Sequence, residues 1–145
     1  MKADGGRQKD GGAVDLGTRT KGFALRVLRV YAALPSGAEA QVLGRQLLRS
    51  GTSVGAHYRE ACRARSHAEF VSKLQGGMQE LEESSYWLEL LVEAHIIPPE
   101  KLGPLMSEAD ELMAILVTCV RNAKAKDEGR QQGRRMKVEG GGAGS

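Results

Sequence analysis

The stretch Ser66-His-Ala-Glu-Phe-Val-Ser-Lys-Leu74 opens an amphipathic segment that decides the fold of this chain. Ser66 followed three residues later by Glu69 forms a capping box, in which the hydroxyl accepts from the Glu69 amide and the carboxylate reaches back to the Ser66 amide. Apolar residues then recur at spacings of three and four: Phe70, Leu74, Met78, Leu81, Leu88, Leu91 and Val92. This period predicts a helix that ends near His95. Within it, Gly76-Gly77 predicts a point of close packing.

Two further helices are predicted before this segment and one after it. The first begins at Thr18 or Thr20, either of which suits an N-cap, and ends at Leu34. The second spans 38–63, and its apolar residues keep their phase across two glycines, so we expect one continuous helix. The last begins after Pro98, with Pro99 at the first helical position, and fades at residues 124–126.

Four amphipathic helices joined by short connections predict an all-α, antiparallel up-down-up-down four-helix bundle. We expect this bundle to cover residues 18–126. Residues 1–17 and 127–145 contain many glycines among charged residues, and the chain ends in Gly-Gly-Gly-Ala-Gly-Ser. Such segments bury too little apolar surface to offset the entropy of ordering, so both tails are expected to be disordered.

Composition argues against several classes of function. Cys62 and Cys119 are isolated, which predicts reduced thiols and neither a disulfide framework nor a metal site. No apolar run approaches the ~20 residues of a membrane span, and no signal peptide opens the chain, so we expect a cytoplasmic protein with no membrane partner. No phosphate-binding loop or nucleophile signature occurs, so we expect neither an enzyme nor a cofactor.

Charge is distributed unevenly along the chain. The net charge of +3 combines 13 Lys/Arg and 6 Asp/Glu in residues 1–75 with one Lys and 9 Asp/Glu in residues 76–120. Residues 121–145 are again basic. A chain divided in this way can bind an anionic partner through its basic part, or pair its two halves between subunits.

One arginine stripe is the strongest candidate binding site. At about 100° per residue, Arg45, Arg49, Arg59 and Arg63 line one side of the second helix, opposite its apolar face. Arginine suits phosphate contacts because its planar fork stays charged, so the stripe can follow a nucleic-acid backbone. The simpler interpretation, favoured by the residues alone, is a solvated face or a contact with a neighbouring subunit.

Trp87 lies at the edge of the apolar face of the third helix. A large aromatic residue at such an edge is typical of a contact with another chain, so Trp87 is a candidate oligomer contact. Partial burial by its own bundle is the alternative.

The segment Gln46-Leu-Leu-Arg-Ser-Gly-Thr-Ser-Val-Gly-Ala-His-Tyr-Arg-Glu-Ala61, together with Ser66-x-x-Glu69-Phe70-x-x-x-Leu74 and Glu80-Leu-Glu82, resembles a family signature. The family is that of the four helix bundle proteins encoded by intervening sequences of bacterial 23S ribosomal RNA genes. His57 stands where that family usually has Asn, and Ala61 where Gly is common.

The resemblance implies a four-helix bundle assembled as a homopentamer, with no catalytic residues to carry over. It also suggests kinship with the accessory variability proteins of diversity-generating retroelements, which are basic pentamers that bind nucleic acid and a reverse transcriptase. We therefore expect an oligomeric, non-enzymatic accessory protein that binds RNA or DNA through its basic face. The alternative is an oligomeric protein-interaction scaffold with no nucleic-acid role.

Overall fold

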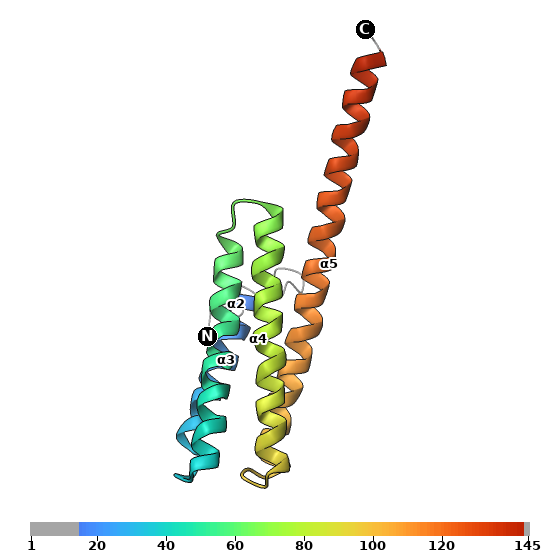
Figure 1. Cartoon of the computed structure of the whole chain (residues 1–145). Helices are drawn as coiled ribbons and strands as arrows, with labels where there is room; N and C mark the ends of the chain where they lie inside the picture. Colours follow the sequence, from blue (N-terminus) through green and yellow to red (C-terminus); the bar gives the residue numbers. More distant parts are fainter. Residues whose placement is uncertain (1–14, 144–145) are drawn as a thin grey trace, which may run out of the picture.

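The computed structural model describes residues 15–143 of the chain, with side chains up to Lys137. It contains four helices, α2 (Leu16–Ala32), α3 (Ala38–Cys62), α4 (His67–Glu93) and α5 (Pro99–Ala143). Residues 15–143 include no strand. Successive helices run in opposite directions (Figure 1), which confirms the predicted all-α up-down-up-down bundle. The disorder predicted for residues 1–14 lies outside the described residues.

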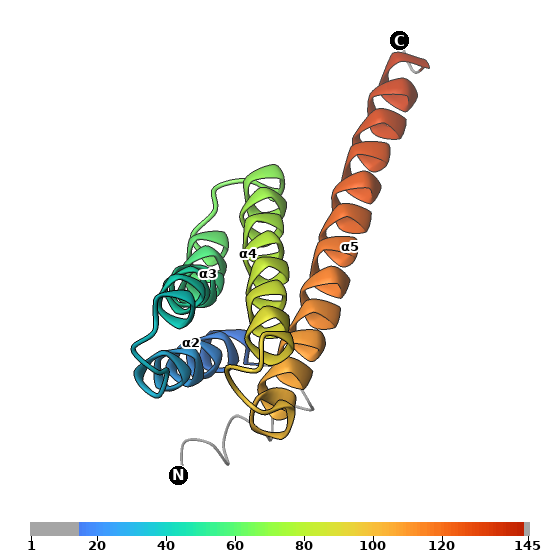
Figure 2. The ribbon, with the colours of Figure 1, turned by 60° about the horizontal axis from the view of Figure 1, so that its bottom comes forward.

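The helices pack in chain order. α2 packs on α3, α3 on α4 and α4 on α5, while the N-terminal end of α2 reaches across to α5 (Figure 2). At that end Arg19 donates two hydrogen bonds to Glu108, one from Nη2 to Oε1 at 2.6 Å and one from Nε to Oε2 at 3.0 Å. A third bond joins Arg19 Nη2 to Glu111 Oε1 at 3.0 Å. These bonds raise the pKa of Arg19, chiefly through Glu108, and connect the first helix to the last.

The predicted apolar faces form the core. The buried members come from all four helices and include Phe23, Val27, Leu47, Val54, Leu74, Leu81, Leu88, Leu91, Leu102, Leu112 and Leu116. Where α3 faces α4, a buried polar pair replaces apolar contact: Ser50 Oγ lies 2.8 Å from Ser84 Oγ. Each hydroxyl also has a backbone carbonyl of its own helix as an acceptor, Leu47 for Ser50 at 3.4 Å and Glu80 for Ser84 at 3.0 Å, so either can donate to the other.

Glycines allow the helices to approach closely, as predicted. α3 is continuous through Gly51 and Gly55. A Cβ atom at Gly51 would lie 2.8 Å from Val27 Cγ2 of α2, and one at Gly76 of α4 would lie 2.6 Å from His57 Cδ2 of α3. The glycines of α4 therefore accommodate the imidazole of His57, one of the two residues that depart from the family signature.

Local caps set the helix ends and correct some predicted boundaries. α2 begins at Leu16, ahead of the predicted Thr18 or Thr20, because the Asp15 carboxylate accepts from the Thr18 amide at 3.0 Å. Ser66 caps α4 as predicted, and its hydroxyl accepts from the Glu69 amide at 3.0 Å. The Glu69 carboxylate was predicted to accept from the amide of Ser66, but it accepts from the amide of Arg65.

The other end of α4 closes in a Schellman motif. His95 adopts a left-handed φ of 61°, and two amides bond backwards, from Ile96 to the Leu91 carbonyl and from His95 to the Val92 carbonyl, each at 3.0 Å. This reversal ends α4 at Glu93, two residues before the predicted end.

α5 corrects the prediction most. The sequence predicted that this helix would fade at Lys126 and that a disordered tail would begin at residue 127, yet the helix continues to Ala143 and projects beyond the bundle (Figure 1). Gly129 and Gly133 weaken it by about 1 kcal/mol each, but the remaining residues up to Lys137 are mostly good helix formers. Contacts also support it, since Gln131 Nε2 donates to Asp127 Oδ2 at 3.2 Å and Arg130 Nη1 donates to His67 Nε2 of α4 at 2.7 Å.

Candidate nucleic-acid interface

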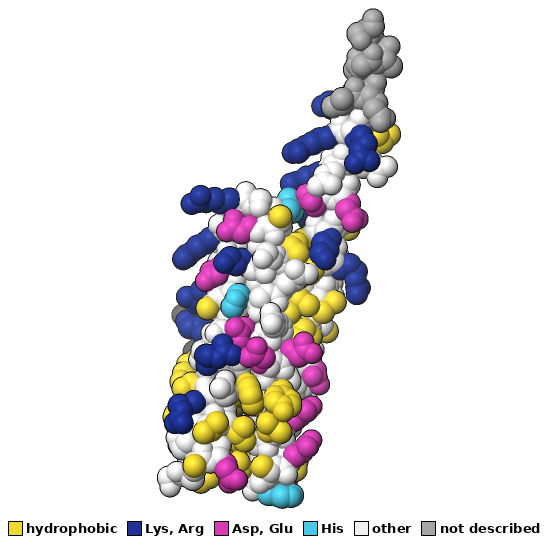
Figure 3. All heavy atoms as spheres, in the orientation of Figure 1, with side chains coloured by type: hydrophobic (Ala, Val, Ile, Leu, Met, Phe, Trp, Pro, Cys, Tyr) yellow, Lys and Arg dark blue, Asp and Glu magenta, His cyan; other side chains and the backbone are white. Residues whose placement is uncertain are grey.

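All four arginines of the predicted stripe are exposed. Arg45, Arg49 and Arg59 lie on α3, and Arg63 is the residue that caps its C-terminal end. Figure 3 shows Lys and Arg side chains along the α3 edge of the molecule and along the projecting part of α5. Asp and Glu side chains gather over the lower parts of α4 and α5.

Arg49 differs from the other three arginines because its charge is paired with carboxylates of the same chain. Its Nη2 lies 2.7 Å from Glu83 Oε1 and its Nη1 lies 3.3 Å from Glu80 Oε1, both on α4. In the described part of the chain, Arg45, Arg59 and Arg63 make no ion pair. The stripe is therefore divided, with its uncompensated charge concentrated toward the C-terminal end of α3.

Packing adds cations at this end. Lys21 of α2 and Arg59 of α3 line one hollow of about 310 Å³, together with Thr52 and Gly55. Arg65 is exposed in the turn that follows Arg63. We call Lys21, Arg59, Arg63 and Arg65 the basic end. The sequence alone did not indicate Lys21, because its position beside Arg59 depends on how α2 packs on α3.

Glu60 follows Arg59 in the chain and places a carboxylate among these cations, but this carboxylate is itself paired. Glu60 Oε1 lies 3.0 Å from Lys73 Nζ of α4. The hydrogen bond and charge of Lys73 lower the pKa of Glu60, so the group stays ionised and stays paired. Its negative charge is thereby offset by Lys73, and Arg59 and Arg63 keep an uncompensated charge.

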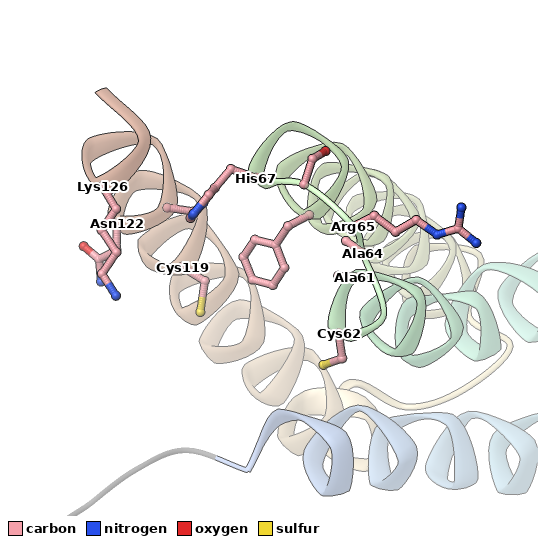
Figure 4. Close-up of a pocket in the computed structure, with 11 residues that line it drawn as sticks. Ala61, Cys62, Ala64, Arg65, His67, Cys119, Asn122 and Lys126 are labelled. Atoms are coloured by element: carbon pink, nitrogen blue, oxygen red, sulfur yellow. The ribbon is translucent and has the colours of Figure 1, made fainter. Parts of the chain in front are cut away.

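A cavity of about 580 Å³ opens beside the basic end, between the α3–α4 turn and α5 (Figure 4). Its lining residues are Ala61, Cys62, Ala64, Arg65, Ser66, His67, Phe70, Cys119, Asn122, Ala123 and Lys126. The thiols of Cys62 and Cys119 both point into the space between α3 and α5, whereas the guanidinium of Arg65 points away from it. The two cysteines were predicted to be isolated from each other, because no local sequence pattern indicates their proximity.

Burial shapes the chemistry next to this cavity. Desolvation raises the pKa of the Cys119 thiol, which keeps it protonated. The pKa of Tyr58 is raised to about 12, first by burial and then by its hydrogen bond with Cys62. Both groups are therefore neutral near pH 7. Among the described residues, no group of three or more His, Cys, Asp or Glu is placed to hold a metal ion.

Trp87 is half-buried against the core, and its ring meets that of Tyr86 edge to face with centroids 5.1 Å apart. The indole Nε1 is buried and has no hydrogen-bond acceptor within residues 15–137. Tyr86 beside it is 53% exposed.

Of the described helices, none is both long and apolar enough to span a bilayer.

Comparisons with known proteins agree with this architecture. The sequence model of the family described as 23S rRNA-intervening sequence protein matches residues 15–118. A similar solved structure is that of a protein of unknown function from the S23 ribosomal protein family of Bacteroides thetaiotaomicron. It is 35% identical, aligns with a TM-score of 0.68, and the match covers 72% of this chain and 96% of that one.

The comparison with curated proteins gives no match. The family match covers well over half of the chain and includes all of α2, α3 and α4. From the family model and the solved relative together, the chain belongs to the 23S rRNA-intervening sequence protein family.

Proposed function

We propose that this protein is a non-enzymatic accessory protein that binds RNA through its basic end. The observation that carries the proposal is the division of the arginine stripe: Arg49 is held by two α4 carboxylates, while Arg59 and Arg63 remain exposed without an ion pair in the described chain. Exposed guanidinium groups that the fold does not use are available for phosphate oxygens.

Two further features support a polyanion as the ligand. Lys21 and Arg65 bring cations from a second helix and from a turn, so the charge spreads over a surface and is not a single line. The exposed bases of α5, including Lys126, Arg130, Arg134 and Arg135, extend this charge beyond the bundle. The family name refers to 23S rRNA, which favours RNA over DNA as the first ligand to test.

The binding should tolerate changes of RNA sequence, because phosphate contacts position a strand and carry little base information. The test is a gel-shift or fluorescence-anisotropy measurement with a labelled single-stranded RNA. We expect the double variant Arg59→Gln/Arg63→Gln to lose about tenfold in affinity, since two charge-assisted contacts are removed.

A matched control removes two exposed cations elsewhere. Arg29→Gln/Lys101→Gln changes the net charge equally, and both residues are exposed on other helices. We expect this control to bind RNA nearly as well as the parent. Equal loss in the two variants would mean that only net charge matters, and no loss in Arg59→Gln/Arg63→Gln would remove the basic end as the binding surface. Melting temperatures near that of the parent establish that both variants are folded.

We also propose that the chain self-associates through the surface around Trp87, with the pentamer suggested by the family resemblance as the expected assembly. The exposed ring of Tyr86 beside the partly buried Trp87 favours this surface, because a second chain can cover an exposed aromatic ring. Such an assembly would also serve the alternative role of a protein-interaction scaffold. Light scattering of the parent should show an oligomer that Tyr86→Glu dissociates; a monomeric parent would refute the assembly.

A further inference from the structure

The cavity between the α3–α4 turn and α5 offers what a nucleobase requires. Its volume of about 580 Å³ falls in the range of small-ligand sites. Apolar walls come from Ala61, Phe70 and Ala123, and Phe70 supplies an aromatic ring of the kind on which bases stack. The cavity therefore suits a flat heterocycle better than a sugar or a bare phosphate.

Polar groups in the wall can meet the edge of a base. The Asn122 amide offers both a donor and an acceptor. The tautomer of His67 is fixed by Arg130: a guanidinium only donates, so His67 Nε2 accepts at 2.7 Å and Nδ1 carries the proton. The Ser66 hydroxyl already accepts from the Glu69 amide and keeps its own hydrogen to donate.

Cationic side chains lie on both sides of the cavity. Arg63 and Arg65 lie in the α3–α4 turn on one side of the cavity. Lys126 and Arg130, one helical turn apart on α5, lie on the other side. Arg65 points away from the cavity, which directs its charge toward a flanking phosphate and not toward the base itself. The basic end thus adjoins the cavity, because Arg65 belongs to both and Arg63 lies between the lining residues Cys62 and Ala64 in the chain.

We propose that this cavity receives an unpaired base of the bound RNA. The inference rests on the proposed function and adds a preference: loops, bulges and ends should bind better than a continuous duplex, in which the bases are stacked and paired.

The two cysteines of the chain make a direct test possible, because both line the cavity. Cys62 is exposed, whereas burial keeps Cys119 protonated. In the full-length Cys119→Ser variant, the rate of Cys62 alkylation by iodoacetamide therefore reports on access to the cavity. We expect adenosine monophosphate to slow this reaction several-fold and ribose 5-phosphate to leave it unchanged. Equal protection by both would mean that phosphate alone is recognised, and no protection by either would also overturn the inference.

RNA then separates the inference from the proposed function. A hairpin with an unpaired loop should slow alkylation of Cys62, and a blunt duplex with the same number of phosphates should not. RNA that binds through Arg59 and Arg63 without protecting Cys62 would overturn the cavity and leave the proposed function standing. Protection by adenosine monophosphate without any RNA binding would overturn both the proposed function and its extension.

A filled cavity provides the last control. Ala64→Trp places a large ring in the cavity from the turn, where Ala64 is half-buried and outside any helix. Ala125→Trp adds the same ring at an exposed position of α5 that does not line the cavity. We expect only Ala64→Trp to abolish protection by the nucleotide. Equal behaviour of the two variants would contradict the assignment.

Discussion

Single glycines decide how closely α2 approaches α3. A Cβ atom at Gly51 would lie 2.8 Å from Val27 Cγ2 and 3.0 Å from Val27 Cγ1, and Val27 is fully buried. Val27 is branched at Cβ and so has little rotamer freedom with which to yield. By contrast, Gly22 in the interior of α2 has no neighbour within 4 Å of an added Cβ atom.

Gly51→Ala should therefore lower the free energy of unfolding by up to about 2 kcal/mol. Alanine improves helix propensity by about 1 kcal/mol, but overpacking against Val27 costs about 1–3 kcal/mol. Gly22→Ala is the matched control, and it should raise stability by about 0.5–1 kcal/mol because nothing obstructs the methyl group in the interior of α2. Urea unfolding measures both. If Gly51→Ala stabilised the chain as much as Gly22→Ala, the close contact of α2 with α3 would be wrong.

Residue identities predicted the core faces correctly but not the partners of the charged groups. Phe23, Leu47, Leu74 and Leu112 are buried as their spacing predicts, because helical periodicity is a local property. The pairing of Arg49 with Glu80 and Glu83 depends on the register between two helices, which no local pattern encodes.

Helices α2 and α4 begin where side chains form hydrogen bonds with free backbone amides. Ser66 was identifiable because a capping box lies within four residues, and Asp15 was missed because Thr18 and Thr20 were equally suitable caps by type. The length of α5 was missed for a different reason. Composition predicted disorder after Lys126, whereas local propensity and the contact of Arg130 with His67 favour continued helix.

Ser66→Ala should lower the free energy of unfolding by about 1 kcal/mol, since the Glu69 amide loses its acceptor at the start of α4. Ser72→Ala is a suitable control, because Ser72 is exposed in the interior of the same helix and replacing it with alanine favours helix. Thermal melts followed by circular dichroism compare the two. Equal melting temperatures for both variants would show that the cap contributes nothing.

The whole molecule pairs part of its charge internally and leaves part of it exposed. The basic first half meets acidic residues through Arg19 with Glu108 and through Arg49 with Glu83, both within one chain. These pairs within one chain account for part of the charge asymmetry seen in the sequence, for which pairing between subunits was one of two alternatives. Arg59 and Arg63, together with Lys21 and Arg65, are among the cations that remain for an external anion.

The measurement that tests this account most directly is the salt dependence of RNA affinity. Phosphate contacts release counterions, so the logarithm of the binding constant should fall linearly with the logarithm of salt concentration. Each contact to single-stranded RNA contributes about 0.7 to the slope, so Arg59→Gln/Arg63→Gln should reduce its magnitude by about 1.4, while Arg29→Gln/Lys101→Gln keeps the parental slope. A parental slope and affinity in Arg59→Gln/Arg63→Gln, with the fold intact, would contradict binding through the basic end.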